Sequence, residues 1–126
     1  MSKKAIFTDH APEPIGPYSQ AIAVNGMLFI SGQIGLDPFS DALITDNIAD
    51  ETRQVMNNIE AILKANNMDF THIVKCSIFL KDMQNFPKVN EVYGKYFKKT
   101  PPARETVEVA RLPRNVNVEI SAIAMA

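Results

Sequence analysis

The stretch TPPARETVEVARLP, residues 100–113, decides how the second half of the chain folds. Pro101 and Pro102 end any preceding helix, and valines and polar residues alternate after them. Side chains along a strand point to opposite faces in turn, so we expect Val107 and Val109 to face the core. The opposite face then carries Arg104, Thr106 and Glu108. Either that face lies in water, or something covers it and the arginine binds a ligand.

The rest of the chain predicts five more strands and two helices. Asn25-Gly26 separates two apolar runs and suits the positive φ angles of a tight hairpin turn. Between Asp46 and Asn66, apolar residues recur every three or four positions, which is typical of an amphipathic helix that Asp46 caps and Asn66-Asn67 ends. Pro87 fits the first turn of a second helix. The expected strands are 4–8, 21–24, 27–32, 72–82, 104–111 and 117–125, and the expected helices are 46–66 and 85–98.

This order of elements predicts an α+β fold, with one mostly antiparallel mixed sheet and two helices on one of its faces. The chain itself then leaves the other face uncovered. If Val118 and Ile120 face the helices, the last strand places these side chains on the open face: Asn117, Glu119, Ser121, Ile123 and Met125. Such a face is too apolar for water and too polar for a dry core. It suits a homo-oligomer interface that carries a polar pocket.

The composition is that of an ordinary globular domain. The 126 residues predict a single domain, 1–126, and 13 basic against 14 acidic residues give a net charge of −1. The sequence has no stripe of basic residues, so nothing in it indicates a nucleic-acid partner. A single cysteine excludes an internal disulfide and a Cys-rich metal site. The start MSKKAIFTDH lacks the apolar run of a signal peptide, and no stretch reaches the roughly 20 apolar residues of a membrane span. We therefore expect a cytoplasmic protein with no membrane partner.

Four segments, in this order and at this spacing, resemble the RidA/YjgF family of reactive-intermediate deaminases. They are IGPYSQA (15–21), FISGQIG (29–35), PPARETVEVARLP (101–113) and VEISAIA (118–124). VNEVYGKYF (89–97) also resembles the family's second helix, and the resemblance extends from about Ala5 to Ala124. It implies a chorismate-mutase-like fold, assembled as a homotrimer with clefts between neighbouring subunits.

The activity that the resemblance implies is hydrolysis of the enamine and imine products of pyridoxal-dependent dehydratases. Examples are 2-aminoacrylate, 2-iminopropanoate and 2-iminobutanoate, which yield a 2-keto acid and ammonia. The resemblance implies no cofactor and no metal. Such imines already hydrolyse in water, so orienting the acid and one water molecule is a sufficient account of catalysis.

Arg104 and Glu119 are the expected catalytic residues. The planar fork of Arg104 matches a carboxylate with two donors, and the alternative is a surface salt bridge. Glu119 lies in the apolar run VEISAIA, where a carboxylate is costly unless it is paired or hydrogen-bonded. The resemblance implies that Glu119 holds the attacking water, and a raised pKa would let it move protons. The alternative is a structural partner for an arginine or a backbone amide.

Further residues expected to bind the substrate are Tyr18, Ser31, Gly32, Asn90 and Thr106. Tyr18 would wall the pocket from the adjacent subunit, or it would only pack at the seam between subunits. Gly32 permits close backbone approach and the Ser31 hydroxyl can donate, with a simple bulge as the alternative. The resemblance places Asn90 at a helix position that reaches the site in relatives, and an architectural role is its alternative.

Thr106 departs from the family pattern, because many relatives carry cysteine two residues after the arginine. Thiol chemistry is excluded there, and the backbone amide of Thr106 remains as a donor to a carboxylate. Cys76 shares a predicted strand face with Val74 and Ile78, so we expect a buried structural cysteine. Glu105 is expected on the valine side of its strand or at the rim.

Two other classes of function remain open. A non-catalytic sensor or regulatory partner would bind 2-keto acids through the same arginine, and only turnover separates it from an enzyme. An RNA-cleaving translation inhibitor is disfavoured by the neutral charge and the lack of a catalytic histidine pair.

Overall fold

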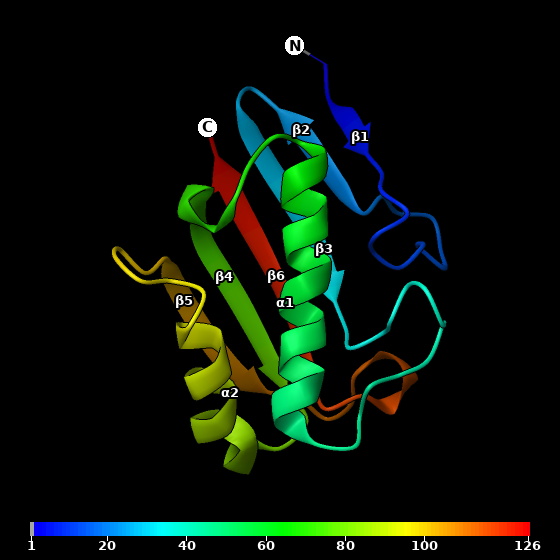
Figure 1. Ribbon diagram of the computed structural model, residues 1–126, viewed down its shortest axis with the longest axis vertical. Coiled ribbons are helices and arrows are strands. Elements are labelled where there is room, and N and C mark those ends of the chain that lie inside the picture. The colour runs from blue at the N-terminus through cyan, green and yellow to red at the C-terminus, as the bar shows by residue number, and fades with distance from the viewer. Residues whose placement is uncertain (1) are drawn as a thin grey trace.

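Two helices cover one face of a six-stranded sheet in a computed structural model that describes residues 2–126 (Figure 1). The strands are β1 (Lys4–Ile6), β2 (Ala21–Val24), β3 (Met27–Gln33), β4 (Ile73–Leu80), β5 (Ala103–Glu108) and β6 (Val118–Met125). The helices are α1 (Ile48–Ala65) and α2 (Phe86–Gly94), with short 3-10 turns at Phe70–His72, Met83–Asn85 and Pro113–Asn115. The predicted α+β class and order of elements are confirmed. No helix within residues 2–126 is long and apolar enough to cross a membrane.

The strands run in the order β1-β2-β3-β6-β4-β5, so β5 is an edge strand. β4 and β5 pair in parallel and the other neighbours are antiparallel, which makes the sheet mixed, as expected. The β2–β3 hairpin turns at Asn25 and Gly26 with φ angles of 51° and 76°. The turn that the Asn-Gly pair predicts is confirmed.

α1 supplies most of the core between the layers, and its start differs by one residue from the prediction. Asn47, not Asp46, caps the helix: its backbone is extended and its side chain accepts the Asp50 N–H at 2.9 Å. Asn67 follows the last turn with a φ of 57°, as the Asn-Asn pair predicts. The fully buried stripe along the helix consists of Val55, Met56, Ile59, Ile62 and Leu63.

α2 ends at Gly94, four residues before the expected end at Lys98. Tyr96 and Phe97 leave the helix and pack on Phe70, with ring centroids 5.1 and 5.7 Å apart. Their aromatic rings therefore belong to a cluster at the end of the helix and do not continue its apolar stripe.

The apolar face of β4 is also interrupted. Val74 was expected in the core and is instead 47% exposed, because the pairing register with β6 shifts between Ile73 and Lys75. Ile73 is buried in its place, while Cys76 and Ile78 are buried as predicted.

β5 has the predicted alternation but the opposite orientation. Arg104 lies level with the buried Cys76 of β4, and its guanidinium contacts α2, whereas Val107 is 40% exposed on the open face. The prediction that the valines face the core and Arg104 faces away is therefore wrong. The reason is that α2, not α1, covers this edge strand, and it presents aromatic rings and an amide that suit a guanidinium.

The open face of β6 is otherwise as predicted. Its side chains Glu119, Ser121, Ile123 and Met125 alternate with the buried Val118, Ile120, Ala122 and Ala124. Asn117 is an exception: its side-chain amide donates to Glu51 of α1, because the residue precedes the strand and lies beneath the helix. Exposed Phe29, Val107 and Met125 make the open face strongly apolar.

The core position of Ile59 gives a stability prediction. Ile59 is fully buried between α1 and the sheet, so Ile59→Ala should lower the free energy of unfolding by about 2–5 kcal/mol. Phe39→Ala, in a side chain that is 76% exposed, should change it by less than about 0.5 kcal/mol. Urea unfolding followed by circular dichroism measures both variants, and equal effects would contradict this description of the core.

Candidate functional site

The first half of the candidate site is an arginine slot between β5 and α2, formed by Arg104, Asn90, Phe86, Tyr93 and Thr106. Arg104 Nη1 donates to Asn90 Oδ1 at 2.7 Å. The guanidinium carbon lies 5.1 Å from the ring centroid of Tyr93 and 5.5 Å from that of Phe86. These contacts fix the plane of the fork and use one of its five N–H groups.

No carboxylate within residues 2–126 forms an ion pair with Arg104. The predicted alternative of a surface salt bridge is therefore not what the described residues form. The arginine has a fixed orientation and free donors, as an anion-binding side chain requires.

Two buried hydroxyls in the arginine slot have no hydrogen-bond partner among residues 2–126, those of Tyr93 and Thr106. Burial raises the pKa of the Tyr93 hydroxyl, with a further contribution from the neighbouring Cys76 thiol. The thiol lies in the same dry environment, which raises its pKa too. Cys76 is thus a buried cysteine, as predicted.

The second half is a carboxylate pocket of about 220 Å³, whose lining includes Glu119, Gly32, Tyr18, Arg114 and Ile15. Glu119 packs directly on Gly32: a Cβ at residue 32 would lie 2.9 Å from the carboxyl carbon. The φ of Gly32 is not positive, so a glycine is not needed there for the backbone conformation. It is needed for the space that the Glu119 side chain occupies. Desolvation by burial raises the pKa of Glu119, and no donor among residues 2–126 binds its carboxylate. The alternative role of Glu119, as a structural partner for an arginine or a backbone amide, therefore has no such group to pair with among residues 2–126.

The loop that carries Tyr18 is fastened to the end of β3. The Ser31 hydroxyl donates to the Ser19 carbonyl at 2.6 Å, and the Ser31 N–H donates to the Gln20 carbonyl at 2.9 Å. Gln20 is buried and binds Thr8 through both ends of its amide. Ser31 thus holds the loop in this chain, and its donation to a substrate stays a prediction. The sequence-based prediction did not include Gln20. The signal for it is that the backbone N–H and C=O groups of a Pro-rich loop need side chains as hydrogen-bond partners.

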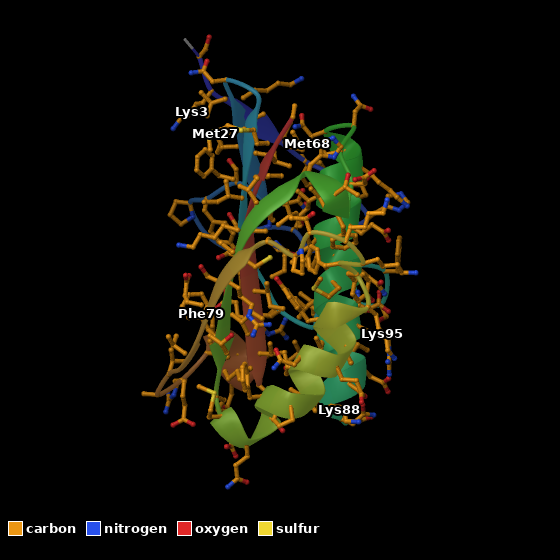
Figure 2. All side chains as sticks on the ribbon, turned by 90° about the vertical axis from the view of Figure 1, so that its left-hand side faces the viewer. Lys3, Met27, Met68, Phe79, Lys88 and Lys95 are labelled. Atoms are coloured by element: carbon orange, nitrogen blue, oxygen red, sulfur yellow. The ribbon has the colours of Figure 1, made fainter. Side chains whose placement is uncertain are left out.

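The two halves lie on opposite faces of the sheet. Arg104 pairs with Cys76, whose side chain points to the helices. Glu119 pairs with Phe79, which projects from the open face in the side view, away from Lys88 of α2 and from Lys95 directly after that helix (Figure 2). The expectation that one face carries both Arg104 and Glu119 is therefore wrong. Within one chain they do not form a common site.

Comparison with known proteins identifies the family. The sequence model of the family described as endoribonuclease L-PSP matches residues 8–126. The crystal structure of a protein of the conserved Rid family from Yersinia pestis superposes with a TM-score of 0.96 at 46% identity, covering 99% of this chain and 100% of that one. The chain belongs to the RidA/YjgF family.

Relatives within the RidA/YjgF family carry different names. A RutC family protein of Pyrococcus horikoshii is 52% identical, with 97% of each chain covered. A human protein named 2-iminobutanoate/2-iminopropanoate deaminase is 46% identical over 99% of this chain and 91% of its own. The RidA/YjgF assignment predicted from the four sequence segments is confirmed.

Other candidate groups in this RidA/YjgF protein lie outside both halves. Glu105 is on the valine side, as predicted, where it accepts from the Ser77 hydroxyl and pairs with Lys75 at 3.2 Å. His10 packs against Phe39, and His72 lies beside Asp69. Residues 2–126 contain no group of three His, Cys, Asp or Glu side chains placed to hold a metal ion.

The raised pKa of Glu119 gives a stability test with a defined sign. Burial disfavours its charged form, so the wild type should lose stability relative to Glu119→Gln as pH rises through the raised pKa. Below the ordinary glutamate pKa of 4.5, the carboxyl is neutral in both folded and unfolded chains. We expect the Tm of the variant minus that of the wild type to be near zero at about pH 4 and positive at about pH 7. Calorimetry across this range measures the difference.

Glu105→Gln is the matched control, with the opposite sign. The Ser77 hydroxyl and the Lys75 ammonium lower the pKa of Glu105, so removing its charge should lower Tm above the ordinary pKa. If both variants shifted Tm in the same direction at neutral pH, desolvation of Glu119 would not be the cause.

Proposed function

We propose that this RidA/YjgF protein hydrolyses the imines of small 2-keto acids, such as 2-iminopropanoate and 2-iminobutanoate, and the enamine 2-aminoacrylate, which tautomerises to 2-iminopropanoate. The observation that carries the proposal is the guanidinium of Arg104, held by Asn90 and two aromatic rings with its remaining donors free. The name of the human deaminase supports the choice of reaction.

The arginine slot binds the substrate carboxylate. Arg104 offers two parallel N–H groups to its oxygens, and a backbone amide lies nearby. The Val109 N–H donates to Leu80 of β4 at 2.8 Å, and N–H groups alternate in direction along a strand. The Thr106 N–H therefore points from the outer edge of β5, where a carboxylate can accept it. This supports the predicted role of the Thr106 amide and leaves its hydroxyl without one.

The carboxylate pocket supplies the water. The Glu119 carboxylate accepts a hydrogen bond from a water molecule and directs its oxygen to the imine carbon. As the C–O bond forms, the C=N electron pair moves to nitrogen, which takes a proton. The hydroxyl proton of the carbinolamine then passes to its amino group, the C=O bond forms, and the C–N bond breaks to release ammonia. A raised pKa suits Glu119 to accept and return the proton during these two steps.

The reaction needs both halves together, and we propose that a homotrimer joins them. The arginine slot of one subunit would face the carboxylate pocket of the next, with Tyr18 at the rim. An apolar open face with exposed Phe29, Val107 and Met125 supports burial against a second copy. The opposite placement of Arg104 and Glu119 supports a site shared between chains.

Arg104→Ala should lower kcat/KM for 2-iminobutanoate by about 10²- to 10⁴-fold, because orientation and a charge-assisted contact are lost together. Arg104→Lys keeps the charge without the fork and should recover only part of the rate. A pyridoxal-dependent threonine dehydratase supplies the imine, and keto-acid formation is followed. Arg53→Ala, which removes an exposed arginine paired with Asp50, is the control and should keep the native rate. Native turnover by Arg104→Ala would contradict the assignment.

A shared site predicts complementation between inactive variants. In trimers that mix Arg104→Ala and Glu119→Gln chains, one cleft of each mixed trimer combines an intact Arg104 with an intact Glu119. Refolding the two variants together in equal amounts should restore about one quarter of the native activity, and light scattering should give about three times the chain mass of 14.0 kDa. No recovery in mixed trimers, or a monomer at micromolar concentration, would exclude the shared cleft.

RNA cleavage is the second candidate, favoured by the family description. Its support is weaker, since the net charge is −1 and the two histidines line different surface hollows. Salt-dependent RNA binding tests it. A 2-keto-acid sensor would use the same arginine slot, and turnover in the coupled assay separates it from an enzyme.

A further inference from the structure

Glu51 is a fully buried carboxylate in the first turn of α1, far along the chain from both halves of the site. Its Oε2 accepts the backbone N–H groups of Asn117 and Val118 at 2.8 and 3.3 Å, and its Oε1 accepts the Asn117 side-chain amide at 2.8 Å. No Lys, Arg or His within residues 2–126 pairs with it. A buried carboxylate without a cation is costly, so these donors and the positive end of the helix dipole must stabilise the charge.

Gly35 makes the room that Glu51 occupies. A Cβ at residue 35 would lie 2.8 Å from Cγ of Glu51 and 3.1 Å from the Ile44 carbonyl oxygen. The Gly35 carbonyl also accepts the Ile44 N–H at 2.7 Å. The Glu51 side chain therefore joins three segments: the bend after β3, the start of α1 and the entry to β6.

The entry to β6 determines where Glu119 lies. Glu51 holds the backbone at residues 117 and 118, immediately before Glu119. No donor within residues 2–126 binds the Glu119 carboxylate, so its position depends on this backbone and on its packing against Gly32. The two glycines of the segment GQIG, 32–35, thus each accommodate a glutamate, one on either side of the sheet.

We infer that Glu51 is a positioning residue for Glu119: by binding the backbone at the entry to β6, it holds the Glu119 carboxylate against Gly32 and at a fixed distance from the substrate. This inference rests on the proposed function only for the role of Glu119 toward water. The arginine slot lies on the same helix-covered face as Glu51 but over the edge strand β5, two strands from β6, and no hydrogen bond or ion pair within residues 2–126 joins Arg104 to Glu51. Loss of Glu51 should therefore affect the chemical step more than substrate binding.

Glu51→Gln tests the inference, because it keeps the size of the side chain but turns an NH₂ group toward N–H donors. We expect kcat for 2-iminobutanoate to fall by about 10- to 100-fold, as for a misplacement of up to about 1 Å, while KM changes by less than about two-fold. When Glu51→Gln is added to Glu119→Gln, kcat should fall by less than about a further two-fold, because Glu51 acts through Glu119.

Thr52→Val is the matched control. Thr52 is equally buried in the next position of α1, and its hydroxyl donates to the Ile48 carbonyl of the same helix at 2.7 Å and not to the backbone at the entry to β6. It should lower Tm and leave kcat unchanged. Three results would each overturn the inference. The folded Glu51→Gln variant could keep the native kcat, or it could raise KM alone. In the double variant, the kcat losses of Glu51→Gln and Glu119→Gln could multiply in full.

A readout without activity separates this inference from the proposed function. Crystal structures of the wild type and Glu51→Gln should show the Glu119 carboxylate moved from Gly32 by about 0.5 Å or more. If Glu51→Gln does not fold, Asn117→Ala removes one of the three donors and should produce a smaller shift of the same kind. An unmoved Glu119 overturns the positioning role, whereas an inactive wild type with a displaced Glu119 in the variant refutes the proposed function alone.

Discussion

Each strand of the sheet must divide its side chains between the face that α1 and α2 cover and the face that they leave open. This constraint places Arg104 under α2 and Glu119 on the open side, two strands away. Neither residue can cross the sheet, because the layer between them is continuous backbone. The same division makes one face a packed core and the other a surface with aromatic and aliphatic side chains, so the proposed assembly and the proposed shared site have a single geometric origin.

Much of the fold is readable from local signals. The Asn25-Gly26 turn and the periodicity of α1 each depend on residues within one turn or one helix, and both predictions are confirmed apart from boundaries. The Pro101-Pro102 pair does not end α2, which stops at Gly94. The cap at Asn47 shows the limit of this approach: Asp46 and Asn47 are both good capping residues, and only the backbone angles decide between them. The motif segments likewise identify the family without any three-dimensional information.

The parts that were not predictable depend on contacts between distant segments. Alternation fixes which side chains of β5 share a face, but which face is buried depends on the helix that covers it. A helix bearing Asn90 and Tyr93 buries an arginine where a helix bearing leucines would bury the valines. The register shift that exposes Val74 and the contact between Glu51 and residue 117 have the same character. Sequence spacing gives no sign of either.

Gly32 and Gly35 have a consequence for how this segment can change during evolution. Neither glycine needs a positive φ, so the backbone alone would accept alanine at both positions. At residue 32 a methyl group is excluded by Glu119, whose carboxyl carbon would lie 2.9 Å away. At residue 35 it is excluded by Glu51 Cγ at 2.8 Å, with the Ile44 carbonyl oxygen also close at 3.1 Å. A substitution at residue 35 therefore depends on the side chain at residue 51, and a substitution at residue 32 depends on the side chain at residue 119. A larger side chain at either glycine requires a shorter side chain at its partner. The two pairs lie on different sides of the sheet, but a change at Glu51 also reaches Glu119 through the backbone of residues 117 and 118.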